Sequence, residues 1–169
     1  MPEIARAAGV AGYEICPEGV VHKELKDARC AGAVLLFRGA PDYPTTLCDL
    51  ADAPPLLWAL GDTTVLKRPM VALVGARNAS SLGTRMAKAL ARELGEAGHV
   101  IVSGLARGVD TAAHVAALDT GTAAVQAGGV DIMYPAENTN LAEQIAQKGL
   151  HLSEQPMGLS PQARHFPPP

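Results

Sequence analysis

Two turns in this sequence combine glycine with arginine directly after an apolar run. The first follows the run that starts at Val71 and continues as Gly-Ala-Arg from Gly75 to Arg77; the second is Ser-Gly-Leu-Ala-Arg-Gly, from Ser103 to Gly108. Glycine allows a backbone to approach a ligand closely, and a planar guanidinium forms paired hydrogen bonds with phosphate oxygens. These turns therefore predict a site for a phosphate-bearing ligand.

The first turn continues to Gly83 and includes Ser80 and Ser81, which could cap the next helix or donate to a phosphate. It lacks the pattern GxGxxG, and no clear ribose-binding acid follows about twenty residues later. A dinucleotide is therefore disfavoured, and we predict no cofactor. The alternative is that Gly75 only forms a tight turn and Arg77 is a solvated surface residue.

In the second turn, Gly104 and Gly108 flank Arg107, which suits a concave group of backbone N–H donors for an anion. Asp110 and His114 are four residues apart and share one helical face. They could form a catalytic pair, but we favour a structural role for both. One histidine and one aspartate do not make a metal site, so no metal is predicted.

Two further segments carry rings that could stack on a nucleobase. Tyr134 follows a predicted strand, although a single tyrosine serves equally well as a loop anchor. Arg164 and Phe166 combine positive charge with a ring, and a packing anchor is the alternative there. Supporting roles are expected for three more residues near strand ends: Asp131, Asn138 and Glu154. Of these, Glu154 could orient an arginine or act as an acid.

The elements that must position these turns alternate between strands and helices, which predicts an α/β fold with a mainly parallel, doubly wound sheet and helices on both faces. In the helix that starts at Ser80 or Ser81, leucine or methionine recurs every four residues and alanines fill the contact side. Strands are expected at 32–37, 70–74, 99–103, 122–127 and 150–153, and helices at about 81–97, 107–118 and 138–148, with Asn138 as a cap and a short helix near 42–47.

Composition limits the class of protein. The 169 residues are 48% hydrophobic and 18% charged, which is typical of a globular protein, and no apolar run is long enough to span a membrane. Three widely spaced cysteines and no secretory signal favour the cytoplasm. The net charge of −3 is unusual for a nucleic-acid binder, but one positive face could still form from Arg77, Arg85, Lys88, Arg92, Arg107 and Arg164.

Several segments together resemble the DNA-processing protein A family, also called DprA or Smf. The resemblance covers about residues 32–167, and its most specific part is Ser-Gly-Leu-Ala-Arg-Gly-Val-Asp from Ser103 to Asp110. It implies an extended Rossmann-like domain that binds single-stranded DNA without sequence preference. It also implies that the protein protects incoming DNA and helps to load the RecA recombinase during natural transformation. Members of the family commonly act as homodimers, and the resemblance implies no enzymatic activity.

By position, the family's phosphate pocket falls on Gly75, Ala76 and Arg77, with help from the Ser103–Gly108 loop and the segment from Arg164 to Phe166. Ala76 stands where the family has serine or threonine, so one hydroxyl donor is missing. The resemblance divides the chain into residues 1–30, a linker or the remnant of a helical domain, and residues 31–169, a C-terminally incomplete DNA-binding domain.

Two alternatives remain open at this point. A nucleotide-processing enzyme of the phosphoribohydrolase type shares this fold, but Gly128-Gly129 is followed by neither the threonine nor the glutamate of that loop. A fragment that serves only as a scaffold or dimerisation module is the other possibility.

Overall fold

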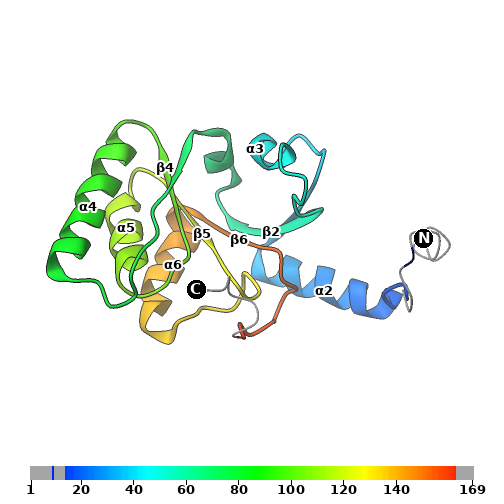
Figure 1. The fold of residues 1–169 in the computed structure, drawn as a ribbon. Coiled ribbons are helices and arrows are strands. Elements are labelled where there is room, and N and C mark those ends of the chain that lie inside the picture. The colour runs from blue at the N-terminus through cyan, green and yellow to red at the C-terminus, as the bar shows by residue number, and fades with distance from the viewer. Residues whose placement is uncertain (1–8, 10–13, 163–169) are drawn as a thin grey trace.

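The computed structural model describes residue 9 and residues 14–162, which form a mixed sheet of six strands in the order β1-β2-β6-β5-β4-β3 (Figure 1). Strands β3 to β6 run parallel to one another, and β2 pairs antiparallel with both β1 and β6. The strands are β1 (Val34–Phe37), β2 (Leu56–Gly61), β3 (Met70–Ala72), β4 (Val100–Ser103), β5 (Thr122–Val125) and β6 (Leu150–Ser153).

Helices α4, α5 and α6 connect successive parallel strands. Because the strand order advances in one direction from β3 to β6, right-handed crossovers place these three helices on one face. The short elements α3 and η1 pack on the other face, so helices on both faces of an α/β sheet are confirmed (Figure 1). The helices are α2 (Glu18–Ala31), α3 (Thr45–Cys48), η1 (Thr63–Lys67), α4 (Ser81–Glu96), α5 (Val109–Ala117), η2 (Ala136–Asn138) and α6 (Thr139–Lys148).

The core has two layers because strand side chains alternate between the faces. In β4, Val100 packs with Leu57 and Leu150 on the side of α3 and η1, whereas Ile101 packs with Ala113 on the side of α4 and α5. Burial on both faces explains why the parallel strands are continuous apolar runs in the sequence. Within the described ranges, none of the helices combines the length and the apolar character that crossing a membrane requires.

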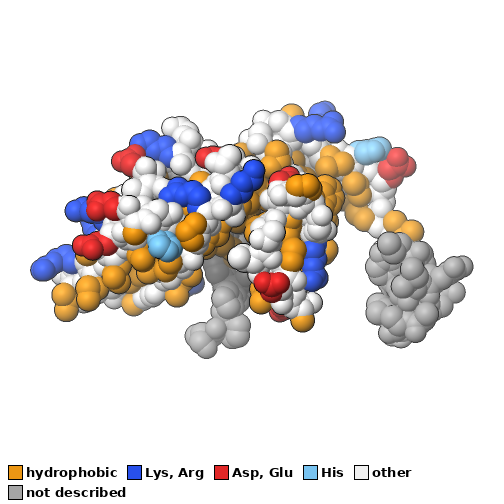
Figure 2. Space-filling model, turned by 90° about the horizontal axis from the view of Figure 1, so that it is seen from above, with side chains coloured by type: hydrophobic (Ala, Val, Ile, Leu, Met, Phe, Trp, Pro, Cys, Tyr) orange, Lys and Arg blue, Asp and Glu red, His pale blue; other side chains and the backbone are white. Residues whose placement is uncertain are grey.

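Helix α4 buries two of its alanines and exposes three of its four large apolar residues. Ala87 and Ala91 face the interior, as the sequence indicated, while Leu82, Met86 and Leu90 are 68%, 59% and 46% exposed. The small alanine side chains let α4 lie close to its neighbours. Its outer side carries exposed apolar residues together with the basic residues Arg85 and Lys88. Figure 2, in which this end of the molecule is at the left, shows hydrophobic, basic and acidic side chains there.

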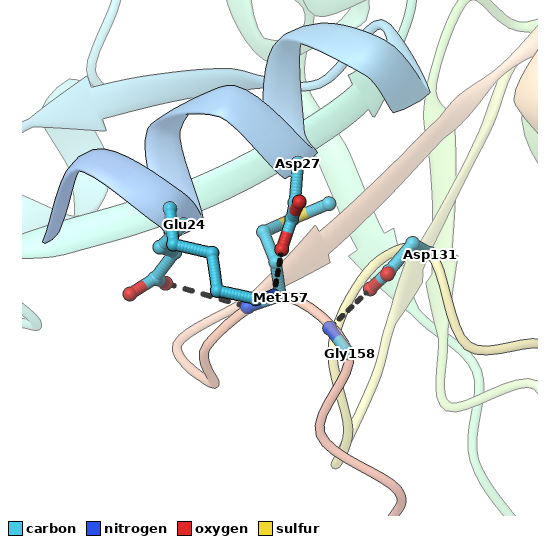
Figure 3. Close-up of polar contacts among 6 residues, drawn as sticks. Glu24, Asp27, Asp131, Met157 and Gly158 are labelled. Carbon is cyan, nitrogen blue, oxygen red and sulfur yellow. Dashed lines mark hydrogen bonds and ion pairs between the residues drawn. The ribbon is translucent and has the colours of Figure 1, made fainter. Parts of the chain in front are cut away.

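Helix α2 packs on the end of the sheet formed by β1 and β2. Ala28 is 2% exposed and packs with Trp58. The Glu24 carboxylate accepts a hydrogen bond from the Trp58 indole N–H at 2.9 Å. It accepts a second one from the Met157 backbone N–H at 3.3 Å (Figure 3). The C-terminal half of residues 1–30, expected to be a linker or a remnant of a helical domain, thus contacts the sheet and the segment after β6.

Candidate functional site

The two glycine-arginine turns lie against each other at the carboxyl edge of the parallel strands. The Val109 N–H donates to the Ala76 carbonyl oxygen at 3.3 Å. Gly108 has φ 82°, and a Cβ there would lie 2.2 Å from that same oxygen and 2.6 Å from the Arg77 carbonyl oxygen. A Cβ on Gly75 would lie 2.8 Å from Val109 Cγ2. Both glycines are therefore required for the contact between the turns.

Helices α4 and α5 both begin at this edge. Ser80 caps α4: its Oγ accepts a hydrogen bond from the Gly83 N–H at 3.1 Å, so one of the two roles expected for this serine is filled within the chain. Ser81 is the exposed first residue of α4. Helix starts carry partial positive charge, which favours an anion nearby.

The backbone N–H groups of the second turn bind an anion that belongs to the protein itself. Asp110 is 6% exposed, and its Oδ2 accepts hydrogen bonds from the Gly104 N–H at 3.1 Å and the Ala106 N–H at 3.4 Å. The Ser103 hydroxyl donates to the Leu73 carbonyl oxygen at 2.6 Å. The Ser103 hydroxyl and the Gly104 N–H thus have partners within the chain, and phosphate binding by these two residues stays a prediction.

Leu105, inside the same turn, has φ 58° and is fully buried. A left-handed backbone costs a non-glycine residue about 1–3 kcal/mol, so neighbouring groups must stabilise it. Asn138 does so: its Nδ2 donates to the Leu105 carbonyl oxygen at 2.8 Å and to Thr111 Oγ1 at 2.9 Å. Asn138 stands at the start of α6 but its side chain does not cap that helix, contrary to the sequence prediction.

His114 and Asp110 have separate partners. His114 Nδ1 lies 2.7 Å from Thr122 Oγ1, and the Thr122 hydroxyl donates to the Ile101 carbonyl oxygen at 2.9 Å. The hydroxyl proton is thus used, so His114 Nδ1 carries the hydrogen and donates to Thr122. Burial, and next the nearby His151, lower the pKa of His114 to about 4.

His151 is also fully buried, and its Nε2 lies 2.8 Å from the Ala142 carbonyl oxygen, to which it donates. Burial lowers the pKa of His151 as well. Two neutral histidines therefore join the sheet to the helices that cover it. His114 on α5 donates to Thr122 of β5, and His151 on β6 donates to Ala142 of α6.

Cationic side chains point outward at the same edge. Arg77 is exposed, and Arg107 Nη1 lies 3.6 Å from Glu137 Oε1 with both side chains about 60% exposed, so this ion pair is weak. A groove of about 330 Å³ runs between α4 and α5 beside these turns. Its lining residues are Thr84, Lys88, Arg107, Gly108, Thr111, Ala112, Val115 and Asn138. Of the expected positive face, the groove brings together Lys88 and Arg107.

The residues expected after β5 and β6 have mixed placements. Tyr134 is 51% exposed and borders a small pocket with Gly104 and Gln126. Asp131 Oδ1 accepts a hydrogen bond from the Gly158 N–H at 2.8 Å (Figure 3). Within residues 14–162, no salt bridge joins Glu154 to an arginine. Arg164 and Phe166 lie outside the described residues.

The glycine pair after β5 is used in packing. The Gly129 N–H donates to the Leu159 carbonyl oxygen at 2.9 Å, and a Cβ on Gly128 would lie 2.7 Å from that oxygen. A Cβ on Gly129 would lie 2.7 Å from the Pro156 carbonyl oxygen. Gly128-Gly129 therefore accommodates the segment that follows β6, a role that spacing alone did not indicate.

The fold and the edge together define a Rossmann-like α/β domain with a cationic carboxyl edge. The model of the family described as DNA recombination-mediator protein A matches residues 34–168, so the chain belongs to that family. The resemblance found in the sequence is confirmed.

Relatives of known name support this membership. The chain is 45% identical to DNA processing protein DprA of Streptococcus pneumoniae over 127 residues, which are 74% of this chain and 45% of that protein. It is 40% identical to protein Smf of Synechocystis over 133 residues, 75% of this chain and 33% of that protein. The chain thus spans less than half the length of these curated relatives.

Two solved structures match the fold. The DprA structure from S. pneumoniae gives a TM-score of 0.81 at 34% identity, covering 94% of this chain and 58% of that chain. DNA processing protein A from Helicobacter pylori, described as having a unique single-stranded DNA binding mode, gives a TM-score of 0.70 at 35% identity. That match covers 79% of this chain and 60% of the other.

Proposed function

We propose that this chain binds single-stranded DNA through the backbone phosphates, without sequence preference, at the carboxyl edge of its sheet. Family membership supports a role in DNA recombination, and the H. pylori relative is described as a single-stranded DNA binder. Contacts to phosphate carry no sequence information, so a site made of arginines and helix starts binds all sequences alike.

One observation carries the proposal: Asp110 and Asp131 at this edge accept hydrogen bonds from within the fold, whereas Arg77 and Arg107 lie on its surface. Asp110 accepts from backbone N–H groups of its own turn, and Asp131 accepts from Gly158. Arg77 and Arg107 remain on the surface of two adjoining turns. The cations Arg77, Lys88 and Arg107 outnumber the exposed Glu137 beside these turns. This end of the sheet is therefore locally positive although the chain carries a net charge of −3, and a polyanion is the ligand that such an edge attracts.

Fluorescence anisotropy with labelled single strands of different sequence tests this proposal. Arg77→Ala should weaken binding to every sequence by a similar factor and should reduce the slope of log K against log salt by about 0.7, the value for one lost phosphate contact on a single strand. Lys26→Ala is the matched control, because Lys26 is an exposed cation on α2, which packs at the other end of the sheet. Equal affinities of wild type, Arg77→Ala and Lys26→Ala would refute the role of Arg77.

The finer parts of the function are proposals for the longer protein that the relatives represent. We propose that it protects incoming DNA and helps to load RecA, acting as a homodimer in natural transformation. RecA-dependent ATP hydrolysis on single strands, measured with and without the protein, should start sooner when the protein is present. If the delay before ATP hydrolysis begins were the same with and without the protein, the mediator role would be contradicted. Sedimentation of the same protein would test whether it is a dimer.

We propose further that the domain acts by binding and not by catalysis. Asp110 and His114, a pair at helical spacing in this edge, make separate hydrogen bonds within the fold. The glycine pair that resembles a nucleotide-binding loop contacts the segment after β6. Incubation with nucleoside monophosphates should release no free base, and release at enzymatic rates would favour the phosphoribohydrolase alternative.

A further inference from the structure

We propose that the groove between α4 and α5 holds one nucleotide of the bound single strand, with its phosphate between Lys88 and Arg107. The inference rests on the proposed function and assigns a place to part of the ligand. It adds Lys88, a residue of α4 outside both glycine-arginine turns, to the DNA-binding surface.

The groove suits a nucleotide in size and in the chemistry of its walls. Its volume of about 330 Å³ is at the lower end of small-molecule sites. Lys88 and Arg107 supply positive charge, while Ala112 and the 47% exposed Val115 form an apolar wall on α5. A phosphate needs the first kind of surface, and the sugar and base can lie on the second.

The neutral polar groups of the groove already have partners. The Thr84 hydroxyl donates to the Ser80 carbonyl oxygen at 3.1 Å, and the Thr111 hydroxyl donates to the Ala106 carbonyl oxygen at 2.8 Å. The cations are less engaged: in the part of the chain that the structure describes, no carboxylate forms a salt bridge with Lys88. Attraction for a ligand here therefore comes from charge.

Two more features place the groove on the path of a strand that contacts Arg77. Gly108 lines the groove and also lies against the carbonyl oxygens of Ala76 and Arg77, so the first turn and the groove adjoin. Helix α5 starts at this point, and the only acidic residue of its first turn, Asp110, faces the N–H groups of its own loop. The partial positive charge at the start of α5 therefore lies at the mouth of the groove, and no exposed carboxylate in that first turn competes for it.

The first test compares Lys88→Ala with Arg92→Ala, using anisotropy with a labelled single strand. Both substitutions remove one positive charge from an exposed position on α4, but only Lys88 lines the groove. Lys88→Ala should weaken binding about tenfold and reduce the salt slope by about 0.7, as for a lost phosphate contact. Arg92→Ala should change affinity by less than about twofold, because an exposed charge outside the contact is screened by salt.

Equal effects of the two substitutions would overturn the inference and leave the proposed function intact, since they would indicate a diffuse field around α4. Absence of single-strand binding by the wild type would instead refute the proposed function. The two failures are thus distinguishable.

A second comparison tests the apolar wall without removing a cation. Val115→Glu places a carboxylate in the groove, and Ala89→Glu places one at an exposed position of α4 outside it. Val115→Glu should reduce affinity at least about tenfold more than Ala89→Glu, because it puts a charge on the apolar wall that faces the sugar and base, inside the same groove as the phosphate. As competitors of the labelled strand, thymidine monophosphate should act at lower concentration than inorganic phosphate. Equal potency of the two would show that only a phosphate binds.

Discussion

Acid should unfold this protein largely through His114. The side chain is fully buried, donates to Thr122 and has a pKa of about 4, below the ordinary value of 6.5. The unfolded chain therefore binds a proton at pH values where the folded chain does not. Above pH 6.5 the titration of His114 does not reduce the free energy of unfolding. That free energy falls as the pH decreases from 6.5 to about 4, and below about pH 4 this group lowers it no further.

The size of the effect follows from the two pKa values. The difference between 6.5 and about 4, at ~1.4 kcal/mol per pH unit, corresponds to ~3 kcal/mol of stability lost. A domain with a typical stability of about 5–15 kcal/mol would lose a considerable part of it. The pKa of His151 is lowered by burial too, so this second histidine adds to the loss in the same direction.

Urea unfolding followed by circular dichroism at pH values from 7 to 4 measures this loss, with His114→Asn as the comparison. Asparagine can still donate to Thr122 but does not titrate, and all other groups, His151 and the carboxylates included, are shared by both proteins. The stability advantage of the wild type over His114→Asn should shrink by about 3 kcal/mol between pH 7 and pH 4. A difference that stays constant over this range would refute the argument, because it would mean that His114 has the same pKa in both states.

Three further substitutions test the geometry of the edge. Gly108→Ala should destabilise the fold by at least about 2 kcal/mol in urea unfolding, since its Cβ would lie 2.2 Å from the Ala76 carbonyl oxygen at φ 82°; wild-type stability would disprove the close contact. Asp110→Ala should cost about 3 kcal/mol by leaving two N–H groups of the turn without an acceptor, and a thermal melt of the variant checks this. Ser80→Ala should cost about 1 kcal/mol through the lost cap on Gly83, and faster amide hydrogen exchange at Gly83 should accompany it.

Most strands and helices of the parallel part were predictable because their signals are local, whereas β2 (Leu56–Gly61) and α2 (Glu18–Ala31) were not expected as a strand and a helix. β6 (Leu150–Ser153) occupies the four residues expected, and α4 begins directly after a serine that caps it. The boundaries of α5 (Val109–Ala117) differ from the expected 107–118 because Gly108, with φ 82° and ψ −119°, is outside the helical region. Short apolar runs and caps determine such elements largely by themselves.

The internal bonds of the edge were not predictable from spacing. Asp110 reaches back to Gly104, and Asn138 reaches Leu105 over 33 residues. Both contacts are made to the turn in which Leu105 adopts φ 58°, and a leucine gives no sign in the sequence that it will do so. A glycine at this position would have indicated a left-handed turn, whereas a leucine does not predict one.

These contacts change how the specific segment from Ser103 to Asp110 is explained. Ser103 donates to Leu73, Gly104 donates to Asp110, Leu105 is buried, and Gly108 lies against Ala76. Most of the segment is therefore constrained by its own packing and not by a ligand.

Arg107 is the exception, since its guanidinium points outward and has only a weak ion pair with Glu137. The fold should tolerate its replacement, while DNA binding should not. Stability and affinity should thus separate within one short segment: substitutions at Gly104 or Gly108 lower both through the fold, and a substitution at Arg107 lowers affinity alone. The glycines and the aspartate build the turn that presents this cation, and the cation itself is left for the ligand.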